Sequence, residues 1–379
     1  MLDKTIEAGG NAVRVVALSP NGQVIATGGL DPEVRFFQAS DLKLIGTIKL
    51  PGVVKTITFA KDQIVAVGTE DGSIQMLQIP FNQGQPLAPD FGSVVQTLNL
   101  GSIPNAISFS KEGKVLFSAD AAGNFSEWKI ASDAPQKSFG HPNFVDVVAF
   151  DPKGLLLATG CHDGKVRLFD IAKGNVVKEI DAHTKAEPSP VYSVLWANDG
   201  KRLISCSMQG SIKAWDVPSG AMAYEIKAYK EKEADNGHKE GVFSIAISPD
   251  QTMLATAGGD RVIKLWNLQD GKFIRNLVNK GLPNSDKEPA SHPGWIYSVR
   301  FTPDGKQLLA VGGAPKGKGV LTQWQPSDGS LVAAHEIASG VLYSLSINPD
   351  AMSIATSAGT GKLGIEFNQG LVIKLPGLK

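Results

Sequence analysis

The stretch VFSIAISPDQTMLATAGGDRVIKLWNL, residues 242–268, decides the fold. Its first six residues alternate in polarity, which predicts a half-buried β-strand. The turn SPDQ follows, and MLATAGG predicts a second strand. The pair Asp260-Arg261 predicts a tight turn, VIKLWNL a third strand and KFIRNLV, 272–278, a fourth. Four short strands with turn residues at each joint predict one antiparallel meander.

The same unit recurs along the whole chain. FVDVVAFDPKGLLLATGCHDGKVRLFDI, residues 144–171, is a second clear copy. The first apolar anchors of eight copies follow one another at spacings of 41 to 54 residues, and they are Val13, Val54, Pro104, Val145, Val191, Val242, Ile296 and Leu342. A period of this size indicates a solenoid, a propeller or an array. A sheet with two apolar faces needs neighbours on both sides, and radial stacking provides them.

Composition limits the possible functions. The 379 residues carry 37 basic and 37 acidic side chains, and the formal net charge is zero. A nucleic-acid-binding surface needs an excess of basic groups, so we expect no nucleic-acid partner. The two cysteines, Cys161 and Cys206, fall in second strands of neighbouring copies but out of register, so we expect buried, reduced thiols and no bound metal. No apolar run reaches the ~18–20 residues that span a bilayer.

The recurring unit resembles the WD40 repeat, the four-stranded blade of a β-propeller. In that family a His before the first strand, a Ser or Thr in the second, an Asp in the tight turn and a Trp in the third form a hydrogen-bonded set. The sixth copy matches this set fully, with His238, Thr256, Asp260 and Trp266. The fourth copy has His141, Thr159 and Asp163, with Phe169 in place of Trp. The other copies keep parts of the set: Thr27 and Asp31; Asp71; Ser118 and Trp128; His183, Ser205 and Trp215; His292 and Trp324; and Thr356.

The resemblance implies one all-β domain over residues 1–379, a β-propeller of four-stranded antiparallel blades. Eight copies predict eight blades, and the alternative is seven, with a distorted copy outside the ring. Residues 3–8 precede the first anchor at the spacing of a fourth strand, so we expect this N-terminal strand to complete the last blade. The tail LVIKLPG, 371–377, competes for that position and is slightly less favoured.

Departures from the repeat are where a binding protein places its specificity. Residues 81–93 interrupt the second copy between its third and fourth strands. Four other departures, 183–190, 227–240, 279–294 and 312–319, follow a fourth strand or a second strand. Connections of these two types leave a meander at the same end. The four insertions are therefore predicted to decorate one face, on copies four to seven.

In the resembled WD40 family the residue after each anchor lies at the mouth of the central channel, so the resemblance implies this place on that same face. In chain order these residues are Arg14, Lys55, Asn105, Asp146, Tyr192, Phe243, Tyr297 and Tyr343. The first four are polar and the last four aromatic, and Phe144 and Trp295 precede their anchors. Clustered surface aromatics are typical of interaction hot spots. The alternative is that these rings only fill space between blades.

The sequence contains few candidate catalytic or metal-binding residues. Four of the six histidines occupy or adjoin the structural position, and His162 precedes Asp163 in an exposed turn. No HExxH spacing and no GxSxG motif occur, and GGAPKGKG, 312–319, lacks the phosphate-loop pattern. We therefore predict neither a cofactor nor an enzyme.

The leading hypothesis is a non-catalytic scaffold that binds a protein or peptide through its loop-rich face. The predicted site is Tyr192, Phe243, Trp295, Tyr297, Tyr343 and His162. The alternative is a propeller that binds a small molecule or catalyses a reaction at the channel mouth. We expect a monomer without a membrane span. The start, MLDKTIEAGG, lacks a secretory leader, which favours a cytoplasmic protein; the alternative is an exported protein whose leader is missing from this sequence.

Overall fold

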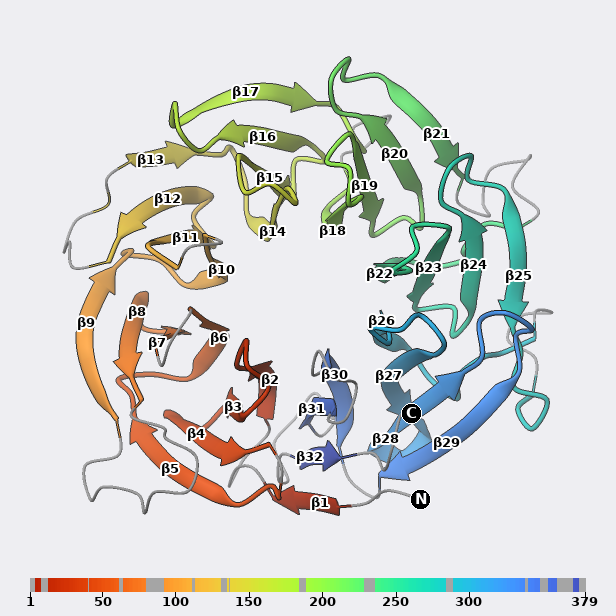
Figure 1. The fold of residues 1–379 in the computed structure, drawn as a ribbon, viewed down its shortest axis with the longest axis horizontal. Coiled ribbons are helices and arrows are strands. Elements are labelled where there is room, and N and C mark those ends of the chain that lie inside the picture. Colours follow the sequence, from red (N-terminus) through yellow and green to blue (C-terminus); the bar gives the residue numbers. More distant parts are fainter. Residues whose placement is uncertain are drawn as a thin grey trace. The chain divides into compact units, whose positions relative to one another are not determined.

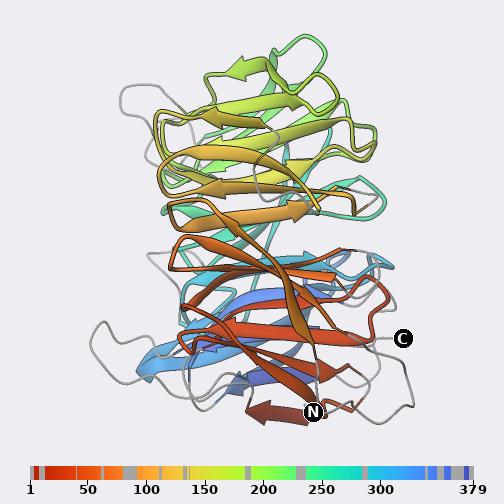
Figure 2. The same ribbon diagram turned by 90° about the vertical axis from the view of Figure 1, so that its left-hand side faces the viewer.

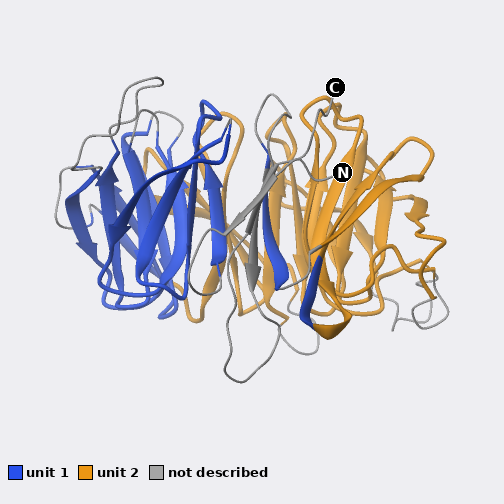
Figure 3. Cartoon of the chain, turned by 90° about the horizontal axis from the view of Figure 1, so that it is seen from below, with its two compact units in different colours: residues 1–140, 317–319, 337–379 blue, residues 141–316, 320–336 orange. Residues whose placement is uncertain are grey.

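The computed structural model is built from antiparallel β-sheets (Figure 1). It describes residues 4–7, 13–39, 41–60, 64–79, 92–110, 113–130, 135, 137–183, 189–227, 236–283, 289–337, 340–347, 354–359 and 371–374. Within these residues helical structure is limited to the 3₁₀ turn η1 (Pro315–Gly317), inside the 312–319 insertion. Contacts divide the chain into unit 1, residues 1–140, 317–319 and 337–379, and unit 2, residues 141–316 and 320–336 (Figure 3).

Unit 1 contains three complete four-stranded sheets, each with its strands in sequence order. Their strands are β2 (Val13–Leu18), β3 (Val24–Gly29), β4 (Glu33–Gln38) and β5 (Leu44–Lys49); β6 (Val54–Phe59), β7 (Ile64–Thr69), β8 (Ser73–Gln78) and β9 (Ser93–Asn99); and β10 (Pro104–Phe109), β11 (Val115–Asp120), β12 (Asn124–Lys129) and β13 (Lys137–Gly140). The three sheets lie side by side (Figure 2). The first strand β6 contacts the first strands β2 and β10 of its two neighbours.

Unit 2 contains four more sheets of the same design. Their strands are β14 (Val145–Phe150), β15 (Leu156–Cys161), β16 (Val166–Asp170) and β17 (Asn175–Ile180); β18 (Val191–Trp196), β19 (Arg202–Ser207), β20 (Ile212–Asp216) and β21 (Met222–Ile226); β22 (Val242–Ile247), β23 (Met253–Gly258), β24 (Ile263–Asn267) and β25 (Phe273–Leu277); and β26 (Ile296–Phe301), β27 (Leu308–Ala314), β28 (Lys318–Trp324) and β29 (Leu331–Ile337). The first strands β14, β18, β22 and β26 lie next to one another in that order.

The hydrophobic cores lie between neighbouring sheets of a unit. One core joins Leu168 on β16 to Val194 on β18 and Trp215 on β20, and the next joins Ile204 on β19 to Trp266 on β24. The second strand of each complete sheet is buried along almost its whole length. Because both faces of a sheet are covered, the exposed side chains lie mainly at the strand ends and on the outer fourth strands.

The expectation of eight complete blades is wrong, and the alternative of seven agrees with the seven four-stranded antiparallel blades of this all-β structure. The eighth copy is divided. Its strands β30 (Val341–Ile347) and β31 (Ile354–Gly359) pair only with each other. The strand β32 (Leu371–Lys374) lies against β31 but forms a separate two-stranded sheet with β1 (Lys4–Glu7). Among the described residues no hydrogen-bonded ladder joins the two pairs, so the last repeat is no continuous blade.

The two chain ends that competed for the closing position pair with each other. Lys4 lies opposite Lys374, and Glu7 lies opposite Leu371. The N-terminal strand is therefore held by the tail. That it completes the last blade, and that residues 1–379 form one domain, remain predictions.

The hydrogen-bonded set of the sixth copy is fully assembled. Trp266 donates its Nε1–H to the Thr256 hydroxyl at 2.8 Å. Nε2 of His238 lies 2.6 Å from that hydroxyl, and Nδ1 of His238 lies 2.8 Å from Oδ2 of Asp260. When Nδ1–H of His238 donates to Asp260, Nε2 accepts a hydrogen bond from the Thr256 hydroxyl, so every member of the set has a partner. All four side chains are buried, and the chain of bonds ties β23, β24 and the turn between them to the loop before β22.

Asp260 is the charged member of this set. Burial by itself would raise the pKa of its carboxyl group. The imidazole of His238 and the backbone N–H groups of Lys239 and Val262 outweigh burial and hold the pKa below its usual 3.8. A carboxylate whose folded-state pKa is lowered stabilises the fold above the unfolded-state pKa.

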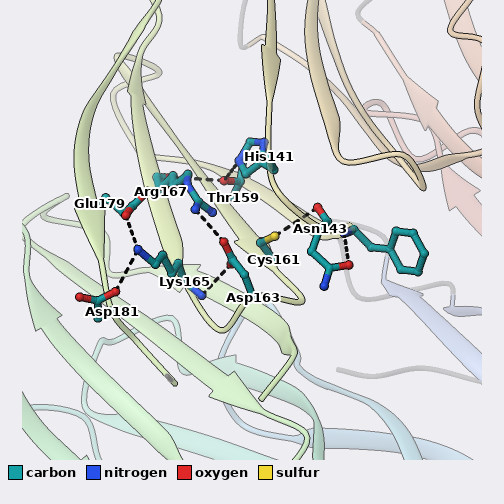
Figure 4. Close-up of polar contacts among 10 residues, drawn as sticks. His141, Asn143, Thr159, Cys161, Asp163, Lys165, Arg167, Glu179 and Asp181 are labelled. Carbon is teal, nitrogen blue, oxygen red and sulfur yellow. Dashed lines mark hydrogen bonds and ion pairs between the residues drawn. The ribbon is translucent and has the colours of Figure 1, made fainter. Parts of the chain in front are cut away.

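The fourth copy arranges its set differently (Figure 4). Nε2 of His141 lies 3.1 Å from the Thr159 hydroxyl. Asp163 accepts instead from the guanidinium of Arg167 at 2.6 Å, and Arg167 also donates to Glu179 at 2.8 Å. The Cys161 thiol donates to the carbonyl of Asn143 at 3.3 Å. A salt-bridged arginine on β16 thus neutralises the aspartate where the sixth copy uses histidine.

The incomplete copies recruit other partners. In the fifth, Ser205 links His183 at 3.0 Å and Trp215 at 3.0 Å. In the third, Trp128 donates to Ser118 at 2.8 Å. In the seventh, His292 lies 3.0 Å from the Val320 carbonyl, while Trp324 donates to Thr322 on its own strand at 2.9 Å. The second uses Asp71, which accepts from the hydroxyls of Thr69 at 2.6 Å and Ser73 at 2.8 Å. Buried polar groups are satisfied in each case.

We predict that Asp260→Asn lowers the free energy of unfolding at neutral pH by about 1–3 kcal/mol, because it removes a charge-assisted network from a buried site. Urea unfolding measures the change. Below pH 3.8 the difference from the wild type should shrink, because wild-type Asp260 loses its stabilising charge as the pH falls through its lowered folded-state pKa. Asp270→Asn, in an exposed turn of the same sheet, is the control, with an expected change within about 0.5 kcal/mol. Equal effects of the two variants would contradict the prediction.

We also predict an acid-sensitive fold. Burial lowers the pKa of His292 to about 4 and, together with the charge of Lys213, the pKa of His183 to about 3. The unfolded chain takes up these protons near the usual 6.5, so the free energy of unfolding should fall as the pH drops from 6.5 toward 4. Each histidine contributes up to roughly 1.4 kcal/mol per pH unit in that window. Urea unfolding of His292→Gln across this range should give a shallower slope, and an unchanged slope would refute the assignment.

Candidate functional site

One position is distinguished by the backbone of all eight copies. In every pairing of first with second strand, the ladder skips one residue near the start of the first strand. The skipped residues are Arg14, Lys55, Asn105, Asp146, Tyr192, Phe243, Tyr297 and Tyr343. They are the residues that the sequence places at the channel mouth. A β-bulge releases a side chain from the strand's alternation and re-aims it, so these eight side chains need not follow the packing of the first strand.

The bulges and the insertions lie at the same ends of their sheets. In the sixth copy Val242 at the start of β22 pairs with Gly258 at the end of β23, and Ile263 at the start of β24 pairs with Leu277 at the end of β25. Connections after second and fourth strands therefore leave from the bulge end. Of the insertions, residues 184–188, 228–235 and 284–288 lie outside the described residues, as do residues 80–91.

Four aromatic side chains meet at the bulge end of unit 2, and we call them the rim cluster: Tyr192, Phe243, Trp295 and Tyr297. The ring of Phe243 stacks on that of Tyr297, with centroids 5.9 Å apart and an angle of 11° between the planes. Trp295 contacts both edge-on at 5.9 and 6.4 Å, and Tyr192 contacts Phe243 at 6.3 Å. Three consecutive sheets thus contribute to one aromatic surface.

Trp295 is the most accessible ring of the rim cluster. Its side chain is 51% exposed, whereas the other five tryptophans of the chain are buried. Its carbonyl accepts the N–H of Gly313 at 3.0 Å, which fixes the loop before β26 against the end of β27. A Cβ atom on Gly312 would lie 2.0 Å from that carbonyl, so only glycine permits this approach. The exposed ring stands on a rigid backbone.

A second group adjoins the rim cluster on β14 and β15. Nε2 of His162 lies 2.5 Å from Oδ2 of Asp146, and the ring of Phe144 contacts the imidazole edge-on at 5.3 Å. Burial raises the pKa of Asp146, and the contact with His162 opposes part of that shift. Burial also raises the pKa of Tyr192, with the charge of Asp146 as a second cause. The two groups are therefore electrostatically linked.

The structure brings together five of the six predicted site residues in unit 2. His162 lies in the Asp146 group, and Tyr192, Phe243, Trp295 and Tyr297 form the rim cluster. Tyr343 lies on β30, in unit 1. Sequence reasoning missed Met208, which follows β19 as His162 follows β15 and is 53% exposed. Its position in the repeat was the available signal.

The described residues contain no group of three His, Cys, Asp or Glu side chains placed to hold a metal ion. Both thiols are free and buried, and burial raises the pKa of Cys161 to about 11 and that of Cys206 to about 12. Among the described residues there is no helix of the length and hydropathy that a membrane crossing requires.

Comparison with known proteins identifies the repeat. The family described as "WD domain, G-beta repeat" matches residues 3–38, 134–170, 174–216 and 231–267. The chain is 27% identical over 260 residues to the human apoptotic protease-activating factor 1, covering 69% of this chain and 19% of that protein. It is 25% identical over 268 residues to the Arabidopsis thaliana guanine nucleotide-binding protein subunit beta, covering 67% of this chain and 69% of that protein.

A solved structure resembles the chain over its whole length. The computationally designed Ika8 protein aligns with a TM-score of 0.73 and 18% identity, covering 98% of each chain, which is a likeness of fold alone. Three of the four family matches, 134–170, 174–216 and 231–267, fall on repeats whose strands and histidine hydrogen bonds are assembled in the structure. The chain contains four segments that match the WD40 repeat, the four-stranded blade of a β-propeller.

Proposed function

We propose that this protein is a non-catalytic scaffold that binds a peptide segment of a partner protein at the rim cluster of unit 2. Proteins of the WD40 family typically serve as protein-interaction scaffolds. The observation that carries the proposal is the contact of four aromatic rings at bulge positions and loop ends of three consecutive sheets, with Trp295 half exposed.

Exposed aromatic side chains on a fixed backbone suit this function. They offer a large contact area and lose little conformational entropy on binding. Hot-spot residues are enriched in tryptophan and tyrosine and cluster together. Phe144 and Met208, 46% and 53% exposed, extend the apolar surface along the same end of unit 2. Space filling between sheets would bury Trp295, Phe144 and Met208, so the exposure of these three side chains favours the binding hypothesis.

The alternative of a small-molecule site or an enzyme has less support. Of the ionisable groups at the rim of unit 2, Asp146 and His162 face each other at 2.5 Å and Tyr192 lies within electrostatic reach of Asp146. Three groups of this kind could bind a proton or a cation. They provide no nucleophile with an adjacent base and no anion-binding loop. A zero net charge favours a protein partner over nucleic acid. A monomeric state remains a prediction.

We predict that random peptides displayed on phage and selected on the intact protein bind at the rim cluster. Trp295→Ala and Tyr297→Ala should each weaken the selected peptides by roughly tenfold or more, because each removes a packed aromatic anchor. Isothermal titration calorimetry with synthetic peptides measures the affinities. Quenching or a shift of Trp295 fluorescence should accompany binding, since the other tryptophans are shielded.

Leu155→Ala is the matched control. Leu155 is 60% exposed, belongs to the same unit and lies in the turn between β14 and β15, at the opposite end of its sheet. This variant should bind as the wild type does. A selection that yields no peptide sensitive to Trp295→Ala, or peptides lost on Leu155→Ala instead, would refute the rim cluster as the binding site.

A further inference from the structure

Asp146 differs from the neighbouring aspartate of its own blade. Burial tends to raise the pKa of both. At Asp163 the Arg167 guanidinium and the Lys165 N–H outweigh burial, and the pKa falls below its usual value. At Asp146 burial outweighs the contact with His162, and the pKa of the carboxyl group lies above its usual value. The ion-pair partner of Asp146 in the described structure is His162, which is charged only when protonated. When the imidazole of His162 is neutral, the Asp146–His162 pair carries one full negative charge at a site that is partly shielded from solvent.

This negative charge stands beside the first ring of the rim cluster. Asp146 and Tyr192 occupy the same bulge position on the adjacent first strands β14 and β18. The Asp146 carboxylate contributes to the raised pKa of Tyr192, so its field reaches the phenol. The rings of Phe243 and Tyr297 continue the surface away from Asp146.

The Asp146 carboxylate and the aromatic rings of the rim cluster both favour a cationic side chain. Aromatic faces attract cations through their negative quadrupole, and an uncompensated carboxylate attracts them through its charge. An apolar or acidic side chain seated here would cover Asp146 without neutralising it, and burying an unpaired charge is costly. A lysine or arginine offsets that cost and lays its aliphatic stem along the rings.

We propose that the partner residue that enters the rim cluster is a lysine or arginine, with its cationic head between Asp146 and Tyr192 and its stem along Phe243 and Tyr297. This inference rests on the proposed function and specifies its ligand: a basic peptide segment. Asp146 acts as the specificity-determining residue, and Trp295 supplies affinity that is independent of charge.

The test is a double-mutant cycle on the phage-selected peptides. Their sequences should share a basic residue. A cationic and a neutral form of one synthetic peptide are compared. If the basic residue is an arginine, the neutral form carries citrulline, its neutral isostere. If it is a lysine, the neutral form carries Nε-acetyllysine. Asp146→Asn should weaken the cationic form by roughly tenfold and the neutral form by less than about twofold, because the cycle isolates the charge pair. Raising the salt concentration should weaken only the cationic form on the wild type.

Asp199→Asn is the control, because this carboxylate is exposed in the turn between β18 and β19, at the opposite end of unit 2. It should leave both peptide forms unchanged, and thermal melting checks that both variants fold. Peptides that depend on Trp295 but carry no basic residue, or an Asp146→Asn effect equal on both forms, would overturn this inference and leave the proposed function standing. Peptides indifferent to Trp295→Ala would overturn the proposed function itself.

Discussion

Burial of both faces of every blade is the constraint on which this structure depends. A four-stranded sheet whose second and third strands are apolar on each side cannot remain exposed, and neighbouring sheets of a unit share cores such as the one that joins Leu168 to Trp215. Side chains on these faces are chosen for packing. Chemistry that serves a partner must therefore lie at the ends of the strands or on the outer edges.

The bulge after each first-strand anchor shows how the chain uses that freedom. The anchor itself, for example Val242 or Ile296, is fully buried. The residue that follows is skipped by the ladder, so its side chain need not fit the core. Such a position tolerates Arg14 in one copy and Phe243 in another without disturbing the blade. The repeat thus places a packing position and a position exempt from core packing at two consecutive residues.

The sequence predicts the fold far better than it predicts the site. Anchors such as Val145 and Val242 fall on the first residues of β14 and β22, because alternation and turn chemistry are local signals. The prediction of a complete eighth blade was wrong, because β30 and β31 pair only with each other while β32 pairs with β1. The spacing of residues 3–8 indicated that the N-terminal strand joins the last repeat, but no local pattern indicated that the two competing end strands pair with each other. The row of bulge residues was predictable as a position, but the stacking of Phe243 on Tyr297 and the partner of Asp146 depend on how neighbouring sheets pack.

The same two side chains, aspartate and histidine, serve different purposes at two depths. His238 and Asp260 are buried, with a distance of 2.8 Å between Nδ1 and Oδ2, and backbone N–H groups complete the shell of the carboxylate. That carboxylate is buried and is therefore out of reach of a ligand. Asp146 and His162 meet at 2.5 Å in a half-exposed place where burial raises the carboxyl pKa. Residue type alone does not distinguish the buried network from the proposed recognition site; the number of donors around the carboxylate and its access to solvent do.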